Sequence, residues 1–116
     1  DEFYFDRFQK LIDLGKREGV RVCQENVVRF RSENVDFLKK MRSALGDDFN
    51  MVFDVKQAIR SGYDPFYVLN EFKNDIVHIH LSDNTKSTVC LRDGAPLILG
   101  DCLMLWTALI IKADML

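Results

Sequence analysis

The sequence predicts an α/β fold in which parallel β-strands alternate with helices. Three short segments rich in β-favouring residues are separated by helical patterns, and such units form right-handed crossovers in a parallel sheet. Each of the three predicted strands also ends on polar side chains. The 116 residues contain no internal repeat or linker, so we expect one domain over residues 1–116. A single parallel sheet covered by helices is the simplest architecture, because a closed eight-stranded barrel needs about twice this length.

The first predicted helix covers residues 3–17. Its apolar stripe consists of Phe5, Phe8, Leu11, Ile12 and Leu14, which recur at helical spacing. Two basic residues in the last turn and Gly19 after them favour its end there. The first predicted strand covers residues 20–26 and delivers Glu25 close to its end. A carboxylate at the end of a buried strand is uncommon unless it has a partner.

The second predicted helix covers residues 34–45, with Ser32 as its cap and an apolar face behind it. The second predicted strand, residues 49–54, again ends on an acid, Asp54. Residues 55–62 lead out of this strand. The order of elements up to this point is helix, strand, helix, strand, which continues the alternation expected of parallel βα units.

The third predicted helix begins at Asp64, which is the expected cap, with a proline at the first helical position. A turn then leads into the third predicted strand, residues 76–81. Within it, His78 and His80 are two positions apart, and side chains at this spacing point to the same face of a strand. Taken alone, this pair is also consistent with a buried strand that carries two hydrogen-bonded histidines.

Residues 82–100 are predicted to form a loop, because glycine and proline interrupt any regular pattern there. A last helix is predicted over residues 101–113. The chain opens at Asp1 without a starting Met and stops at Leu116 without a helix-ending signal. We therefore expect it to be a fragment, cut at both ends, of a longer protein.

Composition narrows the class of function. The formal net charge is -2 and no basic cluster dominates any region, which argues against a nucleic-acid partner. No apolar run approaches the roughly 20 residues of a membrane span. The three cysteines, Cys23, Cys90 and Cys102, have no zinc-type spacing. With no signal peptide, this pattern predicts a reduced, cytoplasmic setting.

Polar groups in parallel α/β folds gather at the carboxyl ends of the strands. Those ends carry Glu25, Asp54 and His80, one from each successive strand. Two carboxylates and an imidazole are typical ligands of divalent Mn, Mg, Co or Zn ions. Taken singly, Glu25 could be a capping or salt-bridged acid and Asp54 an N-cap. Because all three occupy corresponding positions, a divalent metal site is the favoured interpretation.

The motifs Gln24–Asn26, Phe53–Ala58 and His78–Asp83 resemble the sugar phosphate isomerase/epimerase family. Its members are xylose isomerase-like TIM barrels of the AP endonuclease family 2 superfamily. The motifs match in order and spacing over nearly the whole chain, and residues 90–96 are similar to a degraded form of the family's Pro-Gly-x-Gly turn. The resemblance implies a partial (β/α)8 barrel covering about strands five to seven, a fragment of the C-terminal half.

The resemblance also implies roles for individual residues. The family's metal is held by a Glu, an Asp, a His and a further Glu, of which the first three correspond to Glu25, Asp54 and His80. Glu25 would also be catalytic, as one of two acid/base groups. The ion would stabilise an enediolate during proton transfer next to the carbonyl of a sugar or sugar phosphate. The candidate substrate contacts are Gln57, Lys56 and Asp83, which could bind hydroxyl groups or orient ligands, with solvated loop groups as the alternative. Arg92 and Arg60 are the candidate phosphate contacts if the substrate is phosphorylated, with a solvated face as the alternative. His78 is expected to be packed or to support a ligand rather than to bind the ion.

The chain departs from the endonuclease IV type at two positions. Gln57 and Cys90 stand where those members carry histidines. A single-metal isomerase or epimerase is therefore expected rather than a three-metal nuclease, with activity in the full-length form rather than in this fragment alone.

The alternative interpretation is that the chain has no catalytic function. An open three-stranded sheet exposes unpaired strand edges, and half a barrel buries little surface. A truncated barrel could therefore act only as a binding or structural module, and a homo-oligomer could close it. A flavodoxin-like binding domain is less consistent, because Gln24–Val27 contains no glycine to cradle a phosphate.

Overall fold

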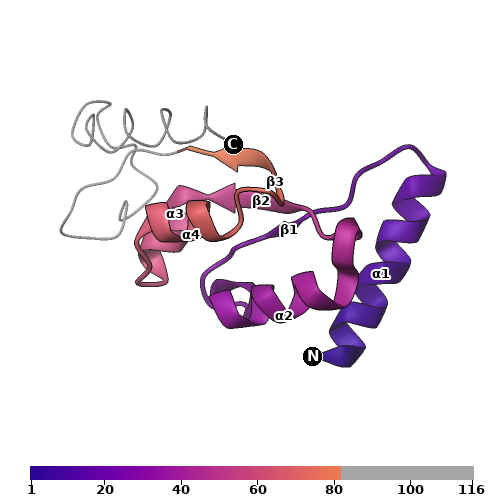
Figure 1. Cartoon of the computed structure of the whole chain (residues 1–116), viewed down its shortest axis with the longest axis horizontal. Coiled ribbons are helices and arrows are strands. Elements are labelled where there is room, and N and C mark those ends of the chain that lie inside the picture. Colours follow the sequence, from indigo (N-terminus) through magenta and orange to yellow (C-terminus); the bar gives the residue numbers. More distant parts are fainter. Residues whose placement is uncertain (82–116) are drawn as a thin grey trace.

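The computed structural model describes residues 1–81, within which three strands form one parallel sheet (Figure 1). The strands are β1 (Gln24–Glu25), β2 (Met51–Asp54) and β3 (Ile76–His80), in the order β1-β2-β3. The sheet of this part of the chain is open, as a section of a TIM barrel is. The predicted α/β fold with parallel strands is confirmed. The predicted loop 82–100 and helix 101–113 lie outside the described residues.

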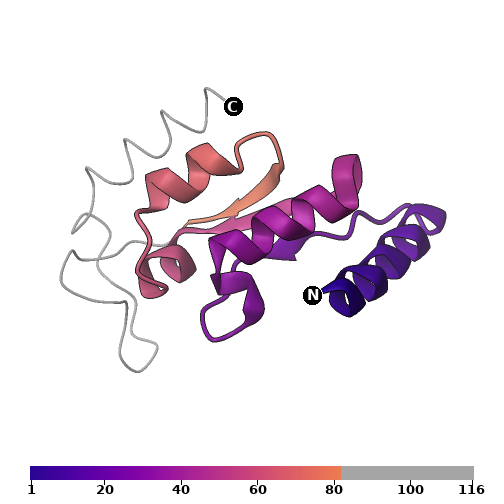
Figure 2. The same cartoon turned by 60° about the horizontal axis from the view of Figure 1, so that its bottom comes forward.

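Helices connect and cover the strands. They are α1 (Glu2–Arg17), α2 (Val35–Leu45), α3 (Val55–Arg60) and α4 (Pro65–Glu71), with 3-10 turns η1 (Arg31–Glu33) and η2 (Gly46–Asp48). α1 packs beside α2 and α3 beside α4. In Figures 1 and 2, α1 lies at one end of the described part of the chain and α3 and α4 lie at the other. Among the described residues, no helix has the length and apolarity needed to cross a bilayer.

The core lies between the sheet and the helices. Met51 and Phe53 of β2 are completely buried, as are Leu38 and Met41 of α2 and Phe72 just after α4. These side chains belong to one continuous apolar cluster. Since alternate residues of a strand point to opposite faces, the two core residues of β2 leave Val52 and Asp54 to the other face.

The face of the sheet turned away from the core carries the polar ends of the strands. In the parallel register, Glu25 pairs with Val52, and Val52 pairs in turn with His78. Two residues further on, Asp54 pairs with His80. Paired residues of neighbouring strands share a face. The register therefore gathers the predicted ligands of all three strands on the same side.

β1 is shorter than the predicted strand over residues 20–26. Only Gln24 and Glu25 pair with β2. The backbone just before them is still bound to the end of α1, where the Val20 N–H donates to the Gly15 carbonyl at 2.7 Å. Val20 is 58% exposed. Its β-branched side chain therefore belongs to an exposed segment and not to a buried strand.

The predicted cap of α2 is wrong. Asn34, not Ser32, caps this helix, since its Oδ1 accepts from the Phe37 N–H at 3.0 Å. The Ser32 hydroxyl instead accepts from the Val27 N–H at 3.2 Å. Both residue types cap helices well, so composition alone does not choose between them. Asp64 caps α4 as predicted.

Arg42 ties α2 to the segment that enters β3. Its guanidinium donates to the Glu71 carbonyl at 2.9 Å, to Glu71 Oε1 at 2.7 Å and to Asp75 Oδ2 at 3.3 Å. It also lies 5.0 Å from the ring centroid of Phe72. The hydrogen bond to the Glu71 side chain raises the pKa of Arg42 above its ordinary value. These contacts hold the start of β3 in place.

Candidate metal centre

Three side chains from three successive strands meet at the carboxyl ends of β1, β2 and β3. His80 Nδ1 lies 3.2 Å from Glu25 Oε1 and 3.7 Å from Asp54 Oδ2. One ligand atom from each residue lies within 4.8 Å of the other two. The structure thus brings together Glu25, Asp54 and His80, hereafter the triad. Binding of an ion by the triad stays a prediction.

The spacing of the triad suits one divalent cation. Carboxylate oxygens and imidazole nitrogens bind such ions at about 2.0–2.2 Å, so two ligand atoms of one ion lie at most about 4.4 Å apart. The triad atoms, within 4.8 Å of one another, need only a small adjustment. Two oxygens and one nitrogen are compatible with Mn, Mg, Co or Zn ions. Three protein ligands also leave coordination positions for water or a substrate.

The three side chains of the triad differ in their exposure to solvent. The side chain of Asp54 is 12% exposed, that of Glu25 is 36% exposed, and that of His80 is 49% exposed. Asp54 therefore forms the floor of the site. Glu25 and His80 stand at its rim, where they can meet a small molecule from solvent.

Asp54 combines a structural contact with its place in the triad. Its Oδ1 accepts from the Gln57 N–H at 2.9 Å and caps α3, which begins at the next residue. No secondary structure is predicted from the sequence for this segment, residues 55–62. Asp54 Oδ2 faces His80 Nδ1. The helix N-terminus therefore fixes the rotation of the carboxylate. Asp54 is therefore both an N-cap and a member of a polar cluster, the two roles that the sequence leaves as alternatives.

Asn26 binds the backbone of β2 beside the triad. Its Oδ1 accepts from the Asp54 N–H at 2.8 Å, and its Nδ2 donates to the Asp54 carbonyl at 3.0 Å. The residue is buried, with 4% exposure. Sequence reasoning noted Asn26 only as part of a motif and gave it no role. The signal that could have found it is a carboxamide directly after a strand-end ligand, where the chain leaves the sheet.

Gln24 anchors the other face of β1. Its Oε1 accepts from the Tyr4 hydroxyl at 2.7 Å, and its Nε2 donates to the Glu25 carbonyl at 2.9 Å. Partial burial raises the pKa of Tyr4, and the hydrogen bond to Gln24 opposes that rise. α1 is thereby connected to the strand end that carries Glu25.

The two histidines of β3 are exposed rather than buried. The interpretation of a buried strand with two hydrogen-bonded histidines is therefore wrong for the described structure. Both face away from the core, since Val52 and Asp54 are their partners in the register. The His78 ring meets the His80 ring edge-on, with centroids 5.1 Å apart. His78 thus contacts a triad residue and is not itself among the three.

The predicted substrate contacts lie in different places. Gln57 Oε1 accepts from the Val28 N–H at 3.0 Å and holds the segment after β1, and Lys56 is partly exposed in the first turn of α3. Their roles toward a substrate stay predictions. Asp83 and Arg92 lie outside the described residues.

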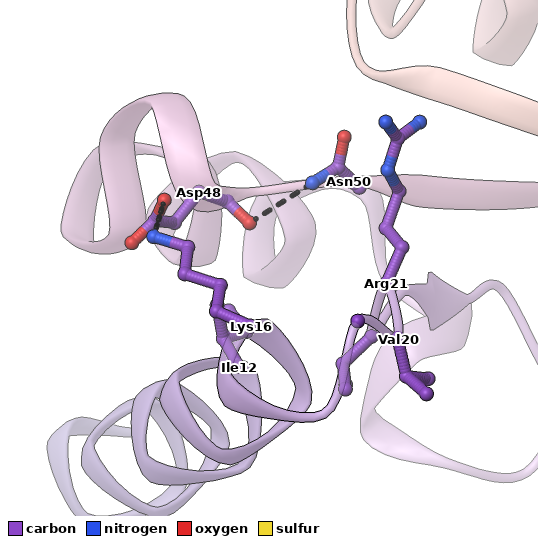
Figure 3. A pocket seen from close by; sticks show the side chains of 8 residues that line it. Ile12, Lys16, Val20, Arg21, Asp48 and Asn50 are labelled. Carbon is purple, nitrogen blue, oxygen red and sulfur yellow. Dashed lines mark hydrogen bonds and ion pairs between the residues drawn. The ribbon is translucent and has the colours of Figure 1, made fainter.

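A cavity of about 290 Å³ lies at the opposite edge of the sheet, where the strands begin (Figure 3). It is lined by Ile12, Lys16, Gly19, Val20, Arg21, Val22, Asp48 and Asn50. Lys16 Nζ meets Asp48 Oδ1 there at 2.6 Å, which raises the pKa of Lys16 and lowers that of Asp48. Because Lys16 and Asp48 pair with each other and the triad lies elsewhere, we interpret this cavity as structural.

Parallel strands that carry two carboxylates and an imidazole at their carboxyl ends define a class of α/β barrel proteins. Its members have the kind of site that binds a divalent metal ion. Residues 1–109 match the family described as Xylose isomerase-like TIM barrel, and the chain belongs to this family. The resemblance predicted from the sequence is thereby confirmed. The family is typically one of metal-dependent sugar isomerases and dehydratases.

Among curated proteins, the chain is similar to inosose dehydratase from Clostridium beijerinckii. The two are 27% identical over 79 residues, which cover 67% of this chain and 26% of the relative. The chain thus spans about a quarter of the length of that protein. No solved structure matches the chain significantly.

Proposed function

We propose that this chain carries part of the active site of a divalent-metal-dependent sugar or sugar phosphate isomerase or epimerase. The observation that carries the proposal is the convergence of the triad, with its ligand atoms within 4.8 Å of one another. Residues 1–116 would supply about strands five to seven of the barrel. The substrate is a small molecule, and a nucleic-acid or membrane partner is not expected. The compartment would be cytoplasmic, and a homo-oligomer could cover the open sheet.

Glu25, Asp54 and His80 are the residues that would hold the ion. When bound, a divalent ion supplies Lewis-acid stabilisation of negative charge on a substrate oxygen. Asp54 is fixed by the N-terminus of α3, so its contribution is a rigid floor to the site. Glu25 is three times as exposed as Asp54, and its carboxylate is therefore the better placed to exchange a proton with a carbon next to a carbonyl.

Polar groups near the triad would orient the substrate. Lys56 lies two residues beyond Asp54, and Gln57 retains its Nε2 donors while its Oε1 is bound to the backbone. Together with Asp83 and Arg92 they are the proposed contacts to substrate hydroxyl or phosphate groups, with Arg60 as a further phosphate contact.

The similarity to an inosose dehydratase favours a second candidate activity. Loss of water next to a ketone begins with removal of a proton beside the carbonyl, which is the same first step as isomerisation. Product analysis separates the two, because a dehydratase product is lighter by one water and an isomerase product has the mass of the substrate. The non-catalytic alternative, a binding or structural module, predicts neither product.

Glu25→Gln tests the proposed function, with Glu33→Gln as its matched control. Glu33 lies in η1 and binds the Arg29 N–H rather than the triad. We expect the wild-type chain to bind Mn²⁺ in calorimetric titration, Glu25→Gln to lose that binding, and Glu33→Gln to keep it. In the protein that contains this chain, Glu25→Gln should abolish turnover while the fold is retained. Turnover at the wild-type rate would show that Glu25 has been given the wrong role.

A further inference from the structure

Beyond the last paired residue of β1, the side-chain carboxamide of Asn26 makes the hydrogen bonds to β2 that the main chain of a longer β1 would make. The ladder between β1 and β2 ends where Glu25 pairs with Val52, yet β2 continues to Asp54. At that point the peptide groups of β2 have no strand residue of β1 beside them. Asn26 Oδ1 and Nδ2 instead bind the N–H and the carbonyl of Asp54, at 2.8 and 3.0 Å.

This double contact joins the two carboxylates of the triad through the backbone. Asn26 directly follows Glu25 in the chain, so its side chain fixes the backbone that carries one ligand against the backbone that carries the other. With 4% exposure, the carboxamide is shielded from water, which would otherwise compete for its donors and acceptor. The carboxylate of Asp54 is itself held by the Gln57 N–H at 2.9 Å. Little freedom remains in the distance between the two stretches of backbone that carry the acids.

We propose that Asn26 is a positioning residue that sets the spacing of Glu25 and Asp54 for cation binding. The inference rests on the proposed metal site. Two like charges held within 4.8 Å of each other repel when no cation lies between them. A rigid clamp prevents the strand ends from moving apart and keeps the acids ready for an ion. Partners of this kind, which contact ligands without touching the metal, typically change affinity by about 10- to 100-fold when mutated.

A purely structural carboxamide would lower stability and leave metal affinity unchanged. Asn34 supplies the matched control, because its side chain also binds the backbone through an N–H, that of Phe37 at 3.0 Å, and lies in the cap of α2. We expect Asn26→Ala to weaken Mn²⁺ binding by about 10- to 100-fold. Asn34→Ala should lower resistance to urea with an unchanged dissociation constant for Mn²⁺.

Asn26→Asp separates positioning from charge. The aspartate keeps an acceptor for the Asp54 N–H but loses the donor to the Asp54 carbonyl. It also adds a negative charge near the triad, which by charge alone would strengthen cation binding. Positioning predicts weaker binding than in the wild type, despite the added charge. This variant also tests the proposal if Asn26→Ala fails to fold.

The experiment is calorimetric titration of the chain and its variants with Mn²⁺, with urea unfolding of each variant monitored by circular dichroism. Weakened binding in folded Asn26→Ala, or in folded Asn26→Asp where Asn26→Ala does not fold, supports the proposal when Asn34→Ala is unaffected. An unchanged dissociation constant in that same deciding variant overturns it and leaves the proposed metal site standing, provided that Glu25→Gln loses binding. A wild-type chain that binds no Mn²⁺ overturns both.

Discussion

Substitutions of Asp54 can separate its role in capping α3 from its proposed role in binding the metal ion. Its Oδ1 caps α3 by accepting from the Gln57 N–H at 2.9 Å, while its Oδ2 faces His80 Nδ1 at 3.7 Å. Asp54→Asn keeps an oxygen for the cap and removes the charge that a cation requires. Asp54→Ala removes both. The two variants should therefore differ in stability and agree in their failure to bind metal.

The magnitudes follow from these contacts. Asn and Asp cap helices about equally well, whereas Ala in their place costs about 1 kcal/mol. Asp54→Asn also relieves repulsion between two carboxylates that lie within 4.8 Å, so the metal-free variant should be at least as stable as the wild type. Mn²⁺ at 100 times its dissociation constant should stabilise the wild-type chain by about 2.7 kcal/mol. Neither Asp54 variant should gain stability from the ion.

The assay is urea unfolding of each chain with and without Mn²⁺. Asp64 provides the control, since its Oδ1 caps α4 through the Phe66 N–H at 2.9 Å and it lies outside the triad. Asp64→Ala should lose about 1 kcal/mol and keep the full response to Mn²⁺. A normal Mn²⁺ response in Asp54→Asn would refute the place of Asp54 in the metal site. Equal stability of Asp54→Asn and Asp54→Ala would refute its role as the cap.

Substitutions at two further positions test the packing that supports the site. In Gly15→Ala the new Cβ would lie 2.6 Å from the Val20 carbonyl oxygen, so overpacking of about 1–3 kcal/mol should exceed the helix-propensity gain of about 1 kcal/mol; a higher urea midpoint would contradict this. Arg42→Met should lower the free energy of unfolding by about 2 kcal/mol, because Glu71 and Asp75 lose a charged donor. Arg42→Lys should restore less than half of that loss, since lysine lacks the forked donor geometry; full recovery by lysine would show that only the charge matters.

The convergence of the triad could be predicted from the sequence because it depends on topology alone. Each residue ends a strand-like segment, the segments alternate with helices, and parallel strands end at one edge of the sheet. No side-chain detail is needed for that step. The alternation of His78 and His80 likewise indicated a shared face, and the register bears this out.

The contacts that hold the triad in place could not be predicted in the same way. The roles of Asn26 and Gln57 depend on how the segment after β1 approaches the end of β2 and the start of α3, across 28 to 29 positions of sequence. One sequence carries no record of that approach. β1 was overextended in the prediction because a β-branched composition is equally compatible with the exposed turn after α1. The alternative interpretation of β3, a buried strand with two hydrogen-bonded histidines, failed for a related reason, since periodicity gives the face of a strand but not what covers it.

The triad exists only in the folded sheet. Glu25 and His80 are 55 positions apart in the chain, and three strands must pair in register before their side chains can meet. An ion that binds the folded sheet and not the unfolded chain adds its binding free energy to folding. The cap at Asp54 and the clamp at Asn26 belong to both processes, because each satisfies backbone groups and orients a ligand with the same atoms. Substitutions that preserve shape and remove charge are therefore the ones that separate metal binding from folding, whereas truncation to alanine changes both together.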